Sequence, residues 1–179
     1  MNRLERSLKL LEKIERKLKV DLGVKTVSEN RLTDNGCFQE WPVYGNTVYF
    51  PAFARARVLD EIIAHEAFHC FLSDKKIPSE IKKHFTKRKS LNGFWGWIKY
   101  YQTGTRCASE ERHIGFVSGY ARTCTEEDLA ETFSAYVNNG FKVRGTVTFD
   151  GDEINLDADS QLRRKFQAMK KLFDEYEFL

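Results

Sequence analysis

The residues of this chain best suited to bind a metal ion and to accept a proton lie together in the segment His65-Glu66-Ala67-Phe68-His69. On an α-helix, positions four apart lie on one face, about 6 Å apart along the axis, so both imidazoles can bind one metal ion. Glu66, rotated by about 100° from His65, can reach a water molecule on that ion. The spacing therefore indicates two metal ligands with a proton acceptor beside them.

This segment has the H-E-x-x-H pattern of zinc metallopeptidases. Its surroundings are apolar, with Ile62, Ile63 and Phe71 close by in the chain. Burying two imidazoles and a carboxylate in such a helix is costly unless they have partners or a metal. The alternative is an ordinary helix whose polar edge happens to carry these residues.

A catalytic zinc site usually needs a third protein ligand and keeps one position for water. The other histidines are His84, in a lysine-rich stretch, and His113, beside acidic residues. Among the carboxylates, Glu127 and Glu131 stand out because they lie four apart on a later predicted helix. If Glu127 binds the metal, Glu131 can accept the Nδ1 proton of a ligating histidine. A salt-bridged surface helix would show the same spacing.

The segment over residues 119–133 resembles the region that follows H-E-x-x-H in the gluzincin-type peptidases related to anthrax lethal factor and to the clostridial Pro-Pro endopeptidases. In that family a Tyr precedes a zinc-ligating Glu by seven residues, and a second Glu follows four residues later within an A-E-x-F segment. The matching residues here are Tyr120, Glu127 and Glu131, the last within A-E-T-F. The order of the elements agrees over residues 41–137.

This resemblance implies a zincin-like site made of His65, His69 and Glu127 as zinc ligands, Glu66 as general base, Tyr120 as the group facing the developing oxyanion and Glu131 as the partner of a ligand. It also implies zinc-dependent hydrolysis of peptide bonds in a protein or peptide substrate by a metal-activated water. Zincins place an edge strand along the cleft, and the strand ending at Phe50 is expected there, where a peptide could add to it. An ordinary core strand fits the same residues.

Hydrophobic spacing predicts the elements that must position these residues. Helices are expected over residues 3–19, 54–72, 79–87, 91–101, 126–137 and 160–176. Thr125 is the expected N-cap of the fifth helix. Strands are expected over residues 20–28, over residues 41–50 around the turn Gly45-Asn46, and over residues 141–155 around Asp150-Gly151.

These elements predict a single α+β zincin-like domain over residues 1–179. It should combine a small mixed or antiparallel sheet, a central H-E-x-x-H helix and a helical C-terminal part, with residues 1–20 forming an amphipathic helix packed on it. The length of 179 residues is sufficient for a substantial core. The four cysteines are spread singly and are expected to be free thiols.

Composition restricts the partners of the protein. The net charge of +3 is nearly neutral for this length, and no stretch approaches the roughly 20 apolar residues of a membrane-spanning helix. The first residues lack the apolar core of a secretory signal. The expectation is therefore a cytoplasmic monomer without a membrane partner.

One local feature supports a different hypothesis. The stretch from Lys75 to Lys89 has seven Lys or Arg and one acidic residue, Glu80, and aromatic residues follow it. Basic charge beside aromatic rings is how proteins hold single-stranded nucleic acid. This leaves two alternatives, a nucleic-acid-associated SprT-like protease and a non-catalytic zinc-containing binding module. A solvated helix face is the plainer interpretation of the charges, and the isolated cysteines offer no evident set of four structural zinc ligands.

Overall fold

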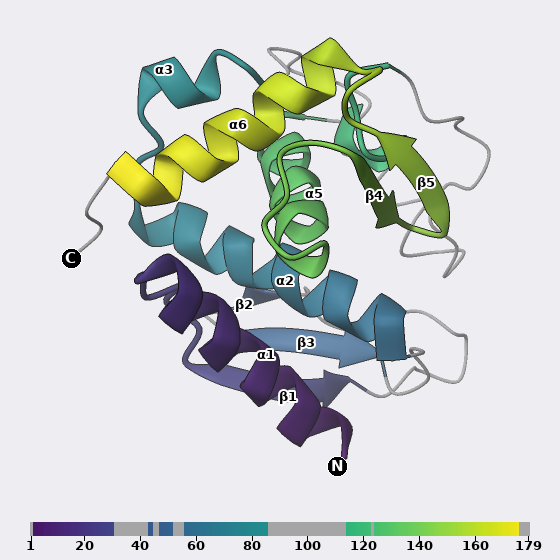
Figure 1. Cartoon of the computed structure of the whole chain (residues 1–179). Coiled ribbons are helices and arrows are strands. Elements are labelled where there is room, and N and C mark those ends of the chain that lie inside the picture. Colours follow the sequence, from purple (N-terminus) through teal and green to yellow (C-terminus); the bar gives the residue numbers. More distant parts are fainter. Residues whose placement is uncertain are drawn as a thin grey trace.

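The computed structural model of the chain describes residues 2–30, 43–44, 47–51, 56–85, 114–122 and 124–175, which form a mixed α/β fold (Figure 1). The α-helices in these ranges are α1 (Arg3–Leu18), α2 (Ala56–Asp74), α3 (Ser79–Lys82), α5 (Thr125–Asn138) and α6 (Ser160–Glu175), and η1 (Tyr120–Arg122) is a short 3-10 helix. The strands are β1 (Thr26–Asn30), β2 (Val43–Tyr44), β3 (Thr47–Pro51), β4 (Thr146–Phe149) and β5 (Asp152–Asn155).

Four predicted helices are confirmed to within two residues at each end, namely α1, α2, α5 and α6. The helix predicted over residues 79–87 is shorter, since α3 covers Ser79–Lys82 alone. The first predicted strand begins later than expected, at Thr26. The helix predicted over residues 91–101 lies outside the described residues.

The prediction of Thr125 as N-cap of α5 is wrong. Cys124 holds the cap position, with extended backbone angles of φ −156° and ψ 176° and no side-chain hydrogen bond to the helix. Asp128, in the first turn of α5, accepts hydrogen bonds from the ammonium group of Lys165 in α6.

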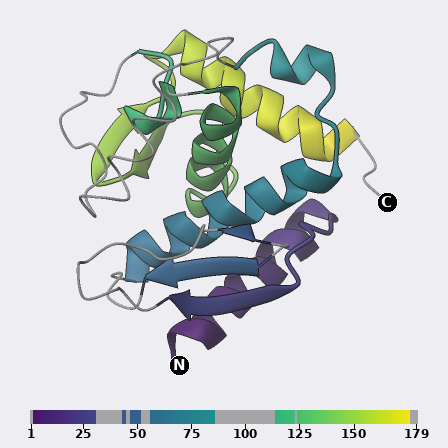
Figure 2. The same ribbon diagram turned by 180° about the vertical axis from the view of Figure 1, so that it is seen from behind.

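The first sheet is mixed, with strand order β1-β3-β2. β1 runs parallel to β3 along its whole length, whereas β2 pairs antiparallel with Thr47 and Val48 only. The strand ending at Phe50, which was expected at an edge, is the middle strand of this order, because β1 pairs with one of its sides along the whole length and β2 pairs with the other side at Thr47 and Val48. Helices α1 and α2 pack against this sheet, which lies in front of them in Figure 2.

The second sheet is the predicted hairpin of β4 and β5. Its turn residues Asp150 and Gly151 both have positive φ angles, of 51° and 90°. These are the angles of a type I′ turn, whose twist suits a two-residue hairpin and which favours an Asp-Gly pair. The turn prediction is thus confirmed.

An aromatic cluster joins α2, α5 and α6. Phe68 of α2 stacks on Phe133 of α5 with ring centroids 4.5 Å apart, and Phe173 of α6 lies 5.6 Å from Phe133. Fully burying a phenyl side chain contributes roughly 1.5–3 kcal/mol. Ser134 also donates a 2.8 Å hydrogen bond to the backbone carbonyl of Glu61. These contacts hold α5 across α2, with the beginning of α5 beside the middle of α2.

Two further sequence expectations concern the cysteines and the membrane. Cys70 and Cys124 carry free thiols, as predicted, while Cys37 and Cys107 lie outside the described residues. Among the helices that the structure describes, none has both the length and the apolar character needed to cross a bilayer.

Candidate metal centre

The two histidines of α2 face each other across one helical turn. Their Nε2 atoms are 3.0 Å apart, and their ring centroids are 4.8 Å apart in an edge-on arrangement. His65 is buried and His69 is partly open to solvent. The same helix buries Phe68 and Phe71 completely. Apolar packing of α2 therefore holds the two imidazoles on one face, as the spacing predicted.

Glu127 reaches the same point from the first turn of α5. Its Oε2 atom lies 3.1 Å from Nε2 of His65 and 3.4 Å from Nε2 of His69. Within the described residues, these three side chains form the only group with donor atoms placed to hold a metal ion. The structure thus brings together all three residues predicted as zinc ligands, from two helices far apart in the chain.

Glu131 lies one turn further along α5, buried beside His65. Its Oε1 atom is 2.8 Å from Nδ1 of His65. This contact favours the tautomer that carries its proton on Nδ1 and leaves the lone pair of Nε2 directed at His69 and Glu127. Glu131 therefore lies where a partner that orients a ligating histidine is needed.

The donor atoms suit a small cation. Two imidazole nitrogens and a carboxylate oxygen share one space, and Oε2 of Glu127 is buried without a well-aligned hydrogen-bond donor among the described residues. Zinc with tetrahedral bonds of about 2.0–2.2 Å would hold its donor atoms about 3.3 Å apart. The observed separations of 3.0, 3.1 and 3.4 Å are close to this value. The residues present therefore fit a zinc ion.

The charges in the centre are strongly coupled. Burial alone would lower the pKa of His65, but Glu127 and Glu131 outweigh burial and raise that pKa well above 6.5. Burial would raise the pKa of Glu127, but the imidazoles of His65 and His69 hold it far below its usual value of 4.5. In the absence of a metal, a proton on His65 thus supplies the positive charge that the cluster requires.

The two residues predicted to take part in catalysis border the centre. Glu66 is half-buried next to His65, and burial raises the pKa of its carboxyl against the opposing effect of the two histidines. Tyr120, in η1, is also half-buried, and its ring centroid lies 6.1 Å from that of His65.

Ser118 was not predicted, although it connects these parts. Its hydroxyl donates a 2.6 Å hydrogen bond to Oε2 of Glu131 and accepts a 3.1 Å bond from the N–H of Ala121. Ser118 thus links the partner of His65 to the turn that carries Tyr120. A serine whose hydroxyl can accept a hydrogen bond from the N–H three residues later is a local signal for the start of a helical turn. The bond from Ser118 to Glu131, by contrast, depends on tertiary structure.

The other histidines do not join the centre in the described structure. His84 lies between the end of α3 and α6. Burial is the main cause that lowers its pKa, and the neighbouring charges of Lys83 and Arg164 lower it further. His113 lies outside the described residues.

A mixed α/β chain that gathers two imidazoles and one carboxylate around a point has the donor set of the zinc metallopeptidases. Comparison with known protein families agrees, since residues 49–176 match the family described as "Putative zinc-binding metallo-peptidase". The match covers more than half of the chain, and the chain therefore belongs to this family. Searches of curated proteins and of solved structures gave no match.

Proposed function

We propose that this protein is a zincin-like, gluzincin-type zinc metalloendopeptidase that hydrolyses peptide bonds in a protein or peptide substrate. The observation that carries the proposal is the convergence of His65, His69 and Glu127, with donor atoms 3.0 to 3.4 Å apart. Membership of the zinc-binding metallo-peptidase family supports it. The match in sequence pattern to lethal factor and the Pro-Pro endopeptidases favours the gluzincin type.

His65, His69 and Glu127 would hold the zinc ion, and Glu131 would orient His65 through its contact with Nδ1. When bound by this set, zinc supplies a lowered pKa for a water molecule and polarises a carbonyl group. Two neutral imidazoles and a single carboxylate suit that chemistry, because they leave part of the charge of the ion uncompensated.

Glu66 is the proposed general base. Because burial raises its pKa, its carboxylate accepts a proton more readily than an exposed glutamate. It takes the proton of the attacking water on a carboxylate oxygen and then delivers this proton to the nitrogen of the leaving amine. Glu66 therefore returns to its starting state at the end of each cycle.

Tyr120 is the proposed donor to the oxyanion. Its ring lies beside that of His65, and a phenol hydroxyl can donate a hydrogen bond to the oxygen on which charge develops. Such a contact stabilises a transition state by about 3 kcal/mol. Replacement of Tyr120 by Phe should therefore lower kcat far more than it weakens zinc binding.

The test compares three glutamate variants of α2 and α5. Glu66→Gln should retain zinc and lose hydrolysis, whereas Glu127→Ala should lose zinc. Glu126→Gln is the matched control, because Glu126 adjoins Glu127 but lies at the surface, 3.6 Å from the ammonium group of Lys82. Zinc content is measured by mass spectrometry of the metal, and hydrolysis on a peptide library with and without a chelator.

Two results would contradict the proposal. Full activity of Glu66→Gln would exclude Glu66 as the general base. A Glu127→Ala variant that binds zinc as tightly as wild type would redirect the search for the third ligand to His113. Cleavage of the library that persists in the chelator would exclude zinc-dependent hydrolysis altogether.

A further inference from the structure

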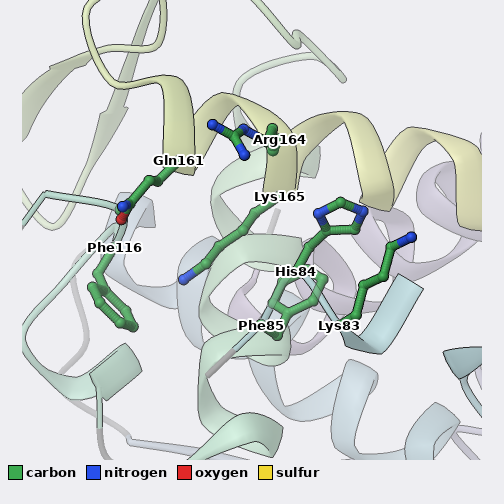
Figure 3. A pocket seen from close by; sticks show the side chains of 8 residues that line it. Lys83, His84, Phe85, Phe116, Gln161, Arg164 and Lys165 are labelled. Carbon is green, nitrogen blue, oxygen red and sulfur yellow. The ribbon is translucent and has the colours of Figure 1, made fainter. Parts of the chain in front are cut away.

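A pocket of about 320 Å³ lies where the end of α3 meets α6 (Figure 3). The residues that define its chemistry are Lys83, His84, Phe85, Phe116, Arg164 and Lys165. The metal ligands do not line it. Its walls come from parts of the chain far apart in sequence, so the sequence alone did not indicate it.

The rim of this pocket is cationic. None of the described residues that line it is acidic, and the described residues include no ion-pair partner for the exposed side chains of Lys83 and Arg164. In Figure 3, Lys83 and Arg164 lie on either side of His84. Burial lowers the pKa of His84, and the charges of Lys83, Arg164 and Lys171 lower it further, which reflects a positive potential at this position.

The floor of the pocket is neutral and aromatic. Lys165 is buried there, and its ammonium group donates to both carboxylate oxygens of Asp128 at 2.8 and 2.7 Å. The same group lies 3.8 Å from the ring centroid of Phe116 and 5.8 Å from that of Phe85. The charge of Lys165 is therefore already compensated, and the cations left for a ligand are those of the rim.

The floor of the pocket contacts the turn of α5 that carries a metal ligand. Asp128, which binds Lys165 of the floor, is the next residue after Glu127. Lys82, next to Lys83, lies 3.6 Å from Glu126. Phe116 leads along the chain toward Tyr120. These contacts connect the floor and the rim of the pocket to the turn of α5 that carries Glu127.

We propose that this pocket binds an acidic side chain of the peptide substrate, with its methylene groups against the aromatic floor and its carboxylate at the cationic rim of Lys83 and Arg164. This inference rests on the proposed function and adds a substrate class to it. The volume of the pocket suits one side chain better than a nucleic-acid strand, which usually needs a long basic groove with successive stacking rings.

The test uses pairs of peptides that differ only in Glu or Gln at one position flanking the cleavage site. Wild type should cleave the best Glu peptide about three- to tenfold more efficiently than its Gln partner, through KM, as expected for two exposed ion pairs. The double variant Lys83→Gln/Arg164→Gln should lose this preference and keep its zinc and its activity on the Gln peptide. Arg144→Gln, an exposed cation on another part of the surface, should keep the preference.

Equal cleavage of Glu and Gln peptides by wild type at every flanking position would overturn the inference while leaving the peptidase intact. So would a preference that persists in the double variant. If zinc-loaded wild type cleaves neither peptide, the proposed function fails. The difference in equilibrium affinity between the Glu and the Gln peptide then tests the pocket independently of hydrolysis. An oligonucleotide that binds at low salt in wild type but not in the double variant would assign the pocket to nucleic acid instead.

Discussion

Replacement of Lys165 by Met should strongly destabilise the protein. The Lys165 side chain is 6% exposed and the Asp128 side chain is 0% exposed, and the ammonium group binds both carboxylate oxygens. Methionine has a similar shape but no charge, so the variant would remove the cation from a buried carboxylate. The pair also anchors α6 on the first turn of α5, beside Glu127.

The expected magnitude follows from this burial. Removal of one partner from a buried ion pair costs about 3–5 kcal/mol of unfolding free energy. For a chain of this size each kcal/mol shifts Tm by about 2–4 °C, so Lys165→Met should lower Tm by about 6–20 °C. The double variant Lys165→Met/Asp128→Leu should recover much of this loss, because a matched apolar pair leaves no buried charge.

Urea unfolding followed by circular dichroism measures the differences in unfolding free energy, with zinc bound and in the presence of a chelator. Arg163→Met is the control on the same helix. Arg163 lies 3.6 Å from Asp157, and their side chains are 33% and 50% exposed, so its loss should cost less than about 1 kcal/mol. The reasoning would be refuted if Lys165→Met cost no more than Arg163→Met, or if the double variant were less stable than the single one.

Three further predictions concern the metal centre and its surroundings. Ser118→Ala should weaken zinc binding about 10- to 100-fold in competition with a chromogenic chelator, since it frees Glu131; unchanged affinity would contradict this role. The raised pKa of His65 stabilises the metal-free fold below pH 6.5, so its Tm should fall as the pH rises above 6.5 toward the folded-state pKa; a flat profile would oppose this. Burial raises the pKa of Cys124 from 9.0 to about 11, so iodoacetamide at pH 8 should label it about 100-fold more slowly than in the unfolded chain, as followed by peptide mass spectrometry.

Local regularities in the sequence predicted the long helices and the hairpin well. The stripe of leucines in α1, the apolar run of α2 and the Asp150-Gly151 turn are each encoded within a few neighbouring residues. The end of α3 and the cap of α5 were predicted wrongly, because hydrophobic spacing shows which face of a helix is buried and not at which residue the helix begins or ends. The central position of β3 depends on β1, with which it pairs in parallel, and no hydrophobic pattern reveals such a partner.

In the candidate site, too, local spacing predicts some of the arrangement and tertiary packing decides the rest. Helical periodicity alone places His65 with His69 on one face and Glu127 with Glu131 on another, since each pair is separated by four residues. That these two faces meet was decided by the packing of Phe68 against Phe133, which no local spacing encodes. The bond from Ser118 to Glu131 and the ion pair of Lys165 with Asp128 also join separate segments. Sequence thus determines which residues a helix presents together, whereas burial of apolar surface between helices decides which of those faces come into contact.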